Sequence, residues 1–104
     1  MIFHFKTGDV TFFESDQQYF EQKLQHLIQF LHHEDKDIDG IEIRVTLNKN
    51  KHTTGPKFES SATIICQHHR KFHASVTTEN IKKCADQLHE KLKPQLQKFH
   101  DMHV

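Results

Sequence analysis

The chain has 104 residues, 35% of them hydrophobic, and its 14 Lys and Arg balance 14 Asp and Glu. This length predicts one domain spanning residues 1–104, and the zero net charge excludes a uniformly basic nucleic-acid binder, so any basic surface must come from the distribution of charge. No apolar segment is long enough to span a membrane, and no charged leader precedes an apolar run at the N-terminus. We therefore expect a cytoplasmic protein that does not associate with membranes.

The first predicted elements are a strand and a helix. Residues 2–6 alternate between apolar and polar side chains, which is typical of a strand with one wet face. Ser15 and Asp16 offer side-chain oxygens that can cap a helix, and the apolar residues of 17–33 recur every three or four positions. We predict a helix over 17–33, ended by the acidic run 34–40.

Three more strands are predicted from alternation with period two. The clearest is 41–48, followed by the polar and basic segment 48–57, which we interpret as a loop. Residues 58–66 and 72–77 alternate in the same way and lie on either side of a short turn. Together they predict an antiparallel meander.

The last predicted element is a helix that begins at Thr78 and Glu79, with Thr78 as its cap. Pro94 lies inside it and removes one backbone donor, so we predict a kink or a break at that position. Its apolar stripe consists of Ile81, Cys84, Ala85, Leu88, Leu92, Leu96 and Phe99.

The order β-α-β-β-β-α predicts an α+β fold, because a sheet with one apolar face and two helices with one apolar stripe each are all buried in a two-layer sandwich. We expect a four-stranded mixed sheet with both helices on one face and with the first two strands parallel. Cys66 and Cys84 are the only cysteines, and their positions in a strand and a helix pattern favour two buried thiols over a disulfide.

Catalytic and metal-binding motifs are absent from the sequence. No nucleophile elbow, P-loop, dinucleotide fingerprint or H-E-x-x-H occurs, so we predict that the chain is not an enzyme and needs no cofactor or small-molecule substrate. The 11 histidines include the pairs His32-His33 and His68-His69, but without a C-x-x-C we predict no metal site. Because imidazoles become charged below about pH 6.5, we expect binding of an anionic partner to strengthen in mild acid.

The lysines of the last helix are more informative about function than the histidines. At 100° per residue from Leu88, one flank of the helix carries Lys82, His89, Lys93 and His100, and the other carries Lys91 and Lys98. Lys83 lies near the outward pole, which also carries Asp86, Glu90 and Asp101. On composition alone, ordinary solubilising charge is the favoured interpretation of these side chains. The polar outer face of the predicted sheet has no pair of aromatic side chains on which bases could stack. Any contact with RNA should therefore be made mainly with its sugar-phosphate backbone and should depend on its shape.

Several short motifs in the right order resemble a known family. Residues 58–64 follow the pattern F-x-A-x-A-x-I only in part, 72-FHAS-75 is similar to an L-H-A strand, and 19-YFEQKL-24 is similar to Y-V-E-x-K-L. The last helix follows D-x-L-x-x-K-L-x-x-Q-L-x-K at Asp86, Leu88, Lys91, Leu92, Gln95, Leu96 and Lys98. Over nearly the whole chain, this order and spacing resembles the ribosome hibernation promoting factor and ribosome-associated inhibitor A family.

The resemblance implies a fold that is similar in its later part to a double-stranded-RNA-binding domain. It also implies a short hibernation factor that occupies the mRNA and tRNA channel of the small ribosomal subunit and blocks initiation in idle cells. Lys91 and Lys98 match the family pattern by position, and helical geometry or nearness in sequence adds the other predicted rRNA-binding residues: Lys82, Lys83, Lys93, Arg70 and Lys71.

We expect a monomer whose partner is the rRNA of the small subunit. The alternative that the sequence leaves open is a protein-interaction module that modulates a transcription or stress regulator, with RNA binding weak or lost. A positive band along the last helix would favour rRNA, whereas lysines interrupted by acids would favour a protein partner.

Overall fold

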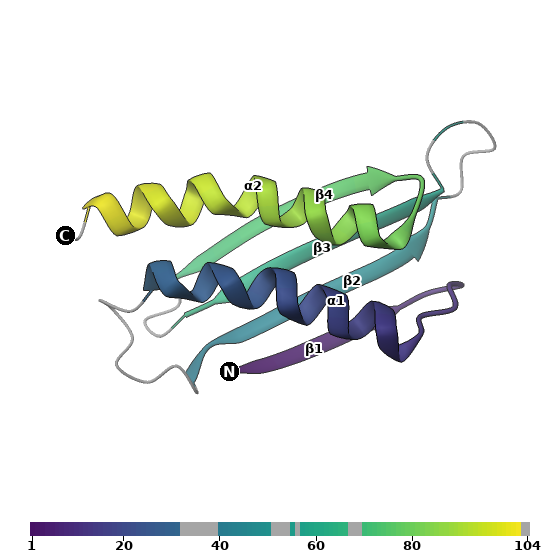
Figure 1. Ribbon diagram of the computed structural model, residues 1–104, viewed down its shortest axis with the longest axis horizontal. Helices are drawn as coiled ribbons and strands as arrows, with labels where there is room; N and C mark the ends of the chain where they lie inside the picture. The colour runs from purple at the N-terminus through teal and green to yellow at the C-terminus, as the bar shows by residue number, and fades with distance from the viewer. Residues whose placement is uncertain (32–39, 51–54, 56, 67–69, 103–104) are drawn as a thin grey trace.

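The computed structural model describes residues 1–31, 40–50, 55, 57–66 and 70–102. Its elements in chain order are β1 (Ile2–Thr7), α1 (Glu14–Gln25), the 3-10 helix η1 (His26–Leu31), β2 (Glu42–Lys49), β3 (Phe58–Ile65), β4 (Lys71–Thr78) and α2 (Ile81–Met102). Figure 1 shows α1 and α2 side by side on one face of the sheet. The predicted α+β fold and its element order are confirmed.

The sheet has the strand order β1-β2-β3-β4. β1 pairs with β2 in parallel, whereas β3 is antiparallel to both β2 and β4. In this register every second residue of a strand faces the helices, and β4 alternates strictly between exposed and buried side chains. β1 and β4 are therefore the two edge strands, and α2 follows β4 along the chain.

One core fills the space between the sheet and the helices. Its centre consists of branched and aromatic side chains that are inaccessible to solvent: Phe20, Leu24, Leu27, Ile41, Ile43, Ile64, Leu88, Leu92 and Leu96. Cys66 and Cys84 are both buried free thiols, as predicted, and they pack in the same core. Burial of these apolar surfaces holds α2 against β3 and β4 and fixes which of its side chains face solvent.

The prediction for the start of α1 was wrong by three residues. The helix begins at Glu14 with Phe13 as its N-cap residue, so Ser15 lies within the first turn and does not cap it. Asp16 still satisfies a backbone group, because its Oδ2 accepts a hydrogen bond from the N–H of Phe13 at 3.3 Å. The last turn tightens into η1, and the predicted end of the helix at 32–33 and the residues 34–39 lie outside the described ranges.

α2 begins at Ile81, and its cap is Asn80 rather than Thr78. The side-chain Oδ1 of Asn80 accepts the N–H of Lys83 at 2.8 Å, which satisfies a donor of the first turn. Thr78 is buried, and its hydroxyl donates to the carbonyl of Asn80 at 2.6 Å and lies 3.0 Å from the Sγ of Cys84. Thr78 therefore fixes the turn between β4 and α2 instead of capping the helix.

Of the kink or break predicted at Pro94, the break is not present. α2 is one helix from Ile81 to Met102 with Pro94 inside it, and Figure 1 shows no interruption along its length. Pro94 and Glu90 are both exposed, so the Glu90 carbonyl that loses its helical donor lies on the side of the helix that faces water. Leu92 and Leu96 are fully buried on the opposite side and hold the helix on the sheet both before and after the proline.

Candidate nucleic-acid interface

The cations of α2 lie on two flanks because the buried stripe of the helix separates them. Lys91 and Lys98 are two turns apart and lie on the side of β4, whereas Lys82 and Lys93 lie on the side of α1 and η1. Lys83 is exposed in the first turn. The flank assignment made from helical geometry is thus consistent with the contacts of Lys82, Lys91 and Lys93, and Lys98 is placed by that geometry alone.

Two side chains of the β4 flank bind the free edge of the sheet. The Nζ of Lys91 donates to the carbonyl of Ser75 at 2.9 Å, and the Nε2 of Gln95 donates to the carbonyl of His73 at 2.9 Å. Edge strands present backbone groups that have no partner strand, and these two donors satisfy two of them. The ammonium of Lys91 is therefore held at the rim of the sheet and not free in solvent.

Arg70 and Lys71 extend the same line of charge towards the C-terminal end of α2. The guanidinium of Arg70 lies 4.2 Å from the centre of the Phe99 ring, and Phe72 packs against the same ring at 5.5 Å. Lys71 is the first residue of β4 and is exposed. We call the surface formed by Arg70, Lys71, His73, Ser75, Lys91, Gln95 and Lys98 the β4–α2 border.

Acidic side chains do not interrupt this border. The outward positions of β4 are Lys71, His73, Ser75 and Thr77, and the positions of α2 on this flank are Gln87, Lys91, Gln95 and Lys98. Among these described positions there is no carboxylate. The border consequently combines four cations with amide and hydroxyl groups along the edge of the sheet.

The α1 flank is different because Asp86 neutralises part of its charge. The hydroxyl of Tyr19 donates to Oδ1 of Asp86 at 2.6 Å, and the same oxygen lies 3.4 Å from the Nζ of Lys23. Lys82 lies over the Tyr19 ring at 5.7 Å. Asp86 was predicted near the outward pole of the helix, and the structure corrects this. Its carboxylate lies against α1, because it accepts the hydrogen bond from Tyr19.

Tyr19 offers a direct spectroscopic test of this cluster, because it is the only tyrosine and the chain has no tryptophan. The hydrogen bond to Asp86, followed by partial burial and the charge of Asp86, raises the pKa of Tyr19, while Lys23 acts in the opposite direction. We therefore expect the phenolate absorbance to appear with a midpoint above the value of about 10 that is usual for tyrosine. The folded state then loses stability as the pH rises above that usual value, because the unfolded chain releases this proton first.

The variant that tests this interpretation of the titration is Asp86→Asn, and its matched control is Glu90→Gln. Both remove one negative charge from α2, but Glu90 is exposed and makes no hydrogen bond to Tyr19. Asp86→Asn should lower the midpoint, and Glu90→Gln should leave it nearly unchanged. Equal midpoints for the wild type and Asp86→Asn would show that the Tyr19–Asp86 contact does not persist in solution.

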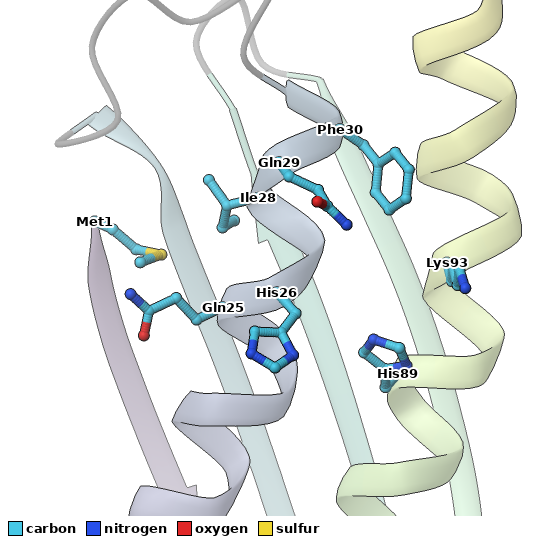
Figure 2. Close-up of a pocket in the computed structure, with 8 residues that line it drawn as sticks. All are labelled: Met1, Gln25, His26, Ile28, Gln29, Phe30, His89 and Lys93. Carbon is cyan, nitrogen blue, oxygen red and sulfur yellow. The ribbon is translucent and has the colours of Figure 1, made fainter.

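Lys93 lines an open cleft between the helices, and His89, which helical geometry places on the same flank of α2, lines it as well. Figure 2 shows His26 and His89 on neighbouring helices with their imidazoles facing one another, and Lys93 one turn further along α2. His26 is 63 positions from His89 in the sequence, and the sequence alone did not connect the two. The helix packing that brings them together has no local signature.

The open face of the sheet is polar, as predicted. Its side chains pair across strands: Thr46 with Ser61 at 2.6 Å, and the hydroxyl of Thr63 with the Nδ1 of His73 at 2.8 Å. None of the described outward positions carries Phe, Tyr or Trp; the rings on this face are the imidazoles of His4 and His73. A surface of this kind can donate hydrogen bonds to phosphate and ribose oxygens, but it offers no platform for stacked bases.

The two cysteines show no sign of nucleophilic chemistry. Burial raises the pKa of the Cys84 thiol, and the hydrogen bond with Thr78 only partly offsets this. Across the described ranges, no three potential metal-ligating side chains lie together, and the pairs His32-His33 and His68-His69 fall outside those ranges. The absence of an enzyme activity and of a metal site therefore stays a prediction.

Among the helices that the structure describes, none combines the length and apolar character needed to cross a bilayer.

Comparisons with known proteins agree with this fold. A ribosomal subunit interface protein from Coxiella burnetii matches 97% of this chain and 99% of its own, with a TM-score of 0.74 and 20% sequence identity. The N-terminal domain of Protein Y from Thermus thermophilus matches 92% of this chain and 94% of its own, with a TM-score of 0.72 and 14% identity. A comparison with curated protein sequences gave no match.

A family model described as sigma 54 modulation protein / S30EA ribosomal protein matches residues 4–103, which is nearly the entire chain. This match confirms the resemblance that the strand and helix motifs indicated. The chain therefore belongs to the sigma 54 modulation protein / S30EA ribosomal protein family, whose members are ribosome-associated modulation factors.

Proposed function

We propose that the protein is a hibernation factor that binds rRNA of the small ribosomal subunit in the channel used by mRNA and tRNAs, and so blocks initiation. Membership of a ribosome-associated family supports the partner, and the polar, cationic surfaces of the domain support rRNA as the component bound. The mechanism is steric occlusion: a folded domain occupies the space that the message and the initiator tRNA need. It requires no cofactor and no chemical step.

The observation that carries this proposal is the uninterrupted charge of the β4–α2 border. Four cations lie along one edge of a rigid sheet and helix, and no described acid lies between them. Lys91 is held in place by the Ser75 carbonyl, and Arg70 by the ring of Phe99. Cations that are already ordered lose less side-chain entropy when they bind phosphates.

The border also favours a nucleic acid over an acidic protein partner. Lys91 lines a shallow hollow together with Thr46, Ser61, Ser75 and Thr77, whose side chains carry hydroxyl groups. Glu59 also lines this hollow, on β3 opposite Thr77, so its carboxylate lies beyond the cations at that end. Hydroxyls and lysines positioned together suit phosphate and sugar oxygens, which supply half or more of the hydrogen bonds at such interfaces. Because the described open face carries no Phe, Tyr or Trp, we predict recognition of the RNA backbone and shape.

The remaining predicted residues form a second, weaker group. Lys82 and Lys83 lie in the first turn of α2, where the helix dipole adds partial positive charge and favours an anion. Lys93 lies further along the α1 flank. We assign these three residues to contacts that add to the border and do not replace it.

The proposal predicts that purified protein in molar excess inhibits cell-free translation and sediments with small subunits. If the four border cations each contact a phosphate, the logarithm of the association constant should fall with the logarithm of salt concentration with a slope of about −3. Sedimentation at several salt concentrations measures this slope. Full-speed synthesis in the presence of excess protein would contradict the proposed function, and a slope near zero would contradict the phosphate contacts.

A further inference from the structure

A second cationic feature lies away from the β4–α2 border, between η1 and α2. It is an open cleft of about 590 Å³, a size typical of sites for small ligands. His26 and Gln29 contribute to it from η1, and His89 and Lys93 from α2, while the ring of Phe30 gives it an apolar wall. Figure 2 shows Gln29, Phe30 and His89 directed towards the space between the two helices, with His26 and Lys93 on either side of it.

The polar side chains of this cleft have no partners within the described part of the chain. His26, His89 and Lys93 make no hydrogen bond or ion pair there, although each has a group that can donate. No described carboxylate lines the cleft. Asp86, on the side of α2 that faces α1, is already engaged by Tyr19 and Lys23.

The surroundings of His89 show that the cleft has an excess of positive charge. Partial burial lowers the pKa of His89, and so do the charges of Lys23 and His26 from α1 and η1 and of Lys93 from its own helix. Glu90 is the one group that acts in the opposite direction. A negative charge bound in the cleft would favour the protonated form of His89 and so oppose the effects that lower its pKa.

The chemistry of this group of donors selects the type of ligand. A divalent metal would need carboxylates or more imidazoles, and Lys23 and Lys93 would repel it. A tetrahedral oxyanion has several acceptor oxygens and suits two imidazoles, an ammonium and the amide of Gln29. An organic group attached to that anion can pack on Phe30.

We propose that this cleft binds the phosphate group of a phosphate ester through His26, His89 and Lys93, and that this binding strengthens in mild acid. Imidazole side chains gain positive charge as the pH falls, so the attraction of a cleft that contains two of them for an anion rises. Lys93 is also among the residues assigned to rRNA contacts, but anion binding in this cleft can be measured without ribosomes, so its failure and the failure of the proposed function are distinguishable.

The first test uses sulfate, because its charge is constant between pH 6 and pH 8, whereas a phosphate monoester itself titrates near pH 6. Histidine side-chain NMR signals, followed during sulfate titration at fixed ionic strength, report binding at His26 and His89 directly. We expect saturable changes at both rings and a dissociation constant on the order of tenfold lower at pH 6 than at pH 8.

Three variants separate a specific site from general surface charge. His89→Gln should remove most of the pH dependence, and Lys93→Gln should weaken binding at both pH values. Lys98→Gln makes the same charge change on the opposite flank of α2 and should leave sulfate binding unchanged. Amide NMR spectra establish that each variant is folded.

The inference is overturned if the signals of His26 and His89 do not saturate, if binding is the same at pH 6 and pH 8, or if Lys98→Gln weakens binding as much as Lys93→Gln. The first and last of these results would mean that the anion is attracted only by diffuse charge. The second would mean that the imidazoles take no part.

Two sources of phosphate are then distinguished with the His89→Gln variant. If the occupant is an RNA phosphodiester, the variant should sediment less with small subunits at pH 6 but normally at pH 8. If the occupant is a small phosphate ester, sedimentation should not change, and a mononucleotide should compete with sulfate for the cleft. Loss of sedimentation in Lys91 and Lys98 variants with intact sulfate binding would show that the two sites are separate.

Discussion

Replacing Lys91 and Lys98 together by glutamine is expected to weaken association with small ribosomal subunits by on the order of tenfold at physiological salt. Each lysine that contacts a phosphate releases condensed counterions, and two lost contacts should also reduce the salt slope by about 1.5. Sedimentation over a range of salt concentrations measures both quantities. Inhibition of cell-free translation should fall in parallel, because occlusion depends on occupancy.

The control for this variant must have the same net charge. Gln18→Glu with Gln22→Glu also lowers the net charge by two, and both glutamines are exposed on α1, away from the β4–α2 border. If binding depends on the border, the glutamine variant should lose affinity and the α1 variant should lose much less. Equal losses would mean that only the overall charge matters and that the border is not the contact surface.

Lys91 also has a structural contact, which the choice of substitution takes into account. Glutamine keeps a side-chain donor that can reach towards the Ser75 carbonyl, whereas glutamate would bring a negative charge to that oxygen. The unfolding free energy of the variant should therefore change by no more than about 0.5 kcal/mol, as for most surface substitutions. A folded variant that still sediments fully would contradict the site assignment.

Most of the sheet could be predicted from the sequence because alternation with period two is a local signal. Residues 41–48 and 72–77 each differ from the observed β2 and β4 only at their ends, and the faces that they bury are the predicted ones. The parallel pairing of β1 and β2 follows from the helix between them. Backbone topology is thus encoded in patterns a few residues long.

Helix ends were predicted less well because several side chains compete for each cap. Ser15 and Thr78 are both good cap residues by type, yet Phe13 and Asn80 occupy the cap positions. Thr78 is instead drawn into the core by Cys84, a contact that the local sequence does not reveal. The choice among candidate caps is made by packing at the helix end.

For the candidate site, the sequence could predict which flank of α2 carries each lysine, but not the contacts that these lysines make. Advancing 100° per residue separates Lys91 and Lys98 from Lys82, but it cannot show that Ser75 holds Lys91. The Tyr19–Asp86 hydrogen bond joins residues 67 positions apart, and it reverses the side on which Asp86 was expected. Side chains that pack between elements depend on helix packing, which no single segment specifies.

The uninterrupted α2 leads to the second large prediction, that Pro94→Ala stabilises the protein by about 2 kcal/mol. Alanine restores a backbone N–H that can donate to the carbonyl of Glu90, and it removes the contact of the proline ring with the preceding turn. Proline costs about 3 kcal/mol relative to alanine in a helix interior, and it returns roughly 0.4–1 kcal/mol by restricting the unfolded chain. Subtracting the second value from the first gives the expected gain in unfolding free energy for Pro94→Ala.

Urea unfolding followed by far-ultraviolet circular dichroism measures this change, which should raise the midpoint without altering the m-value. In thermal unfolding the same gain corresponds to about 10 °C for a domain of this size. Gln97→Ala, at an exposed position one turn away, should change stability by no more than about 0.5 kcal/mol. An unchanged or lower stability for Pro94→Ala would mean that α2 accommodates Pro94 without the loss of stability expected in a regular helix interior.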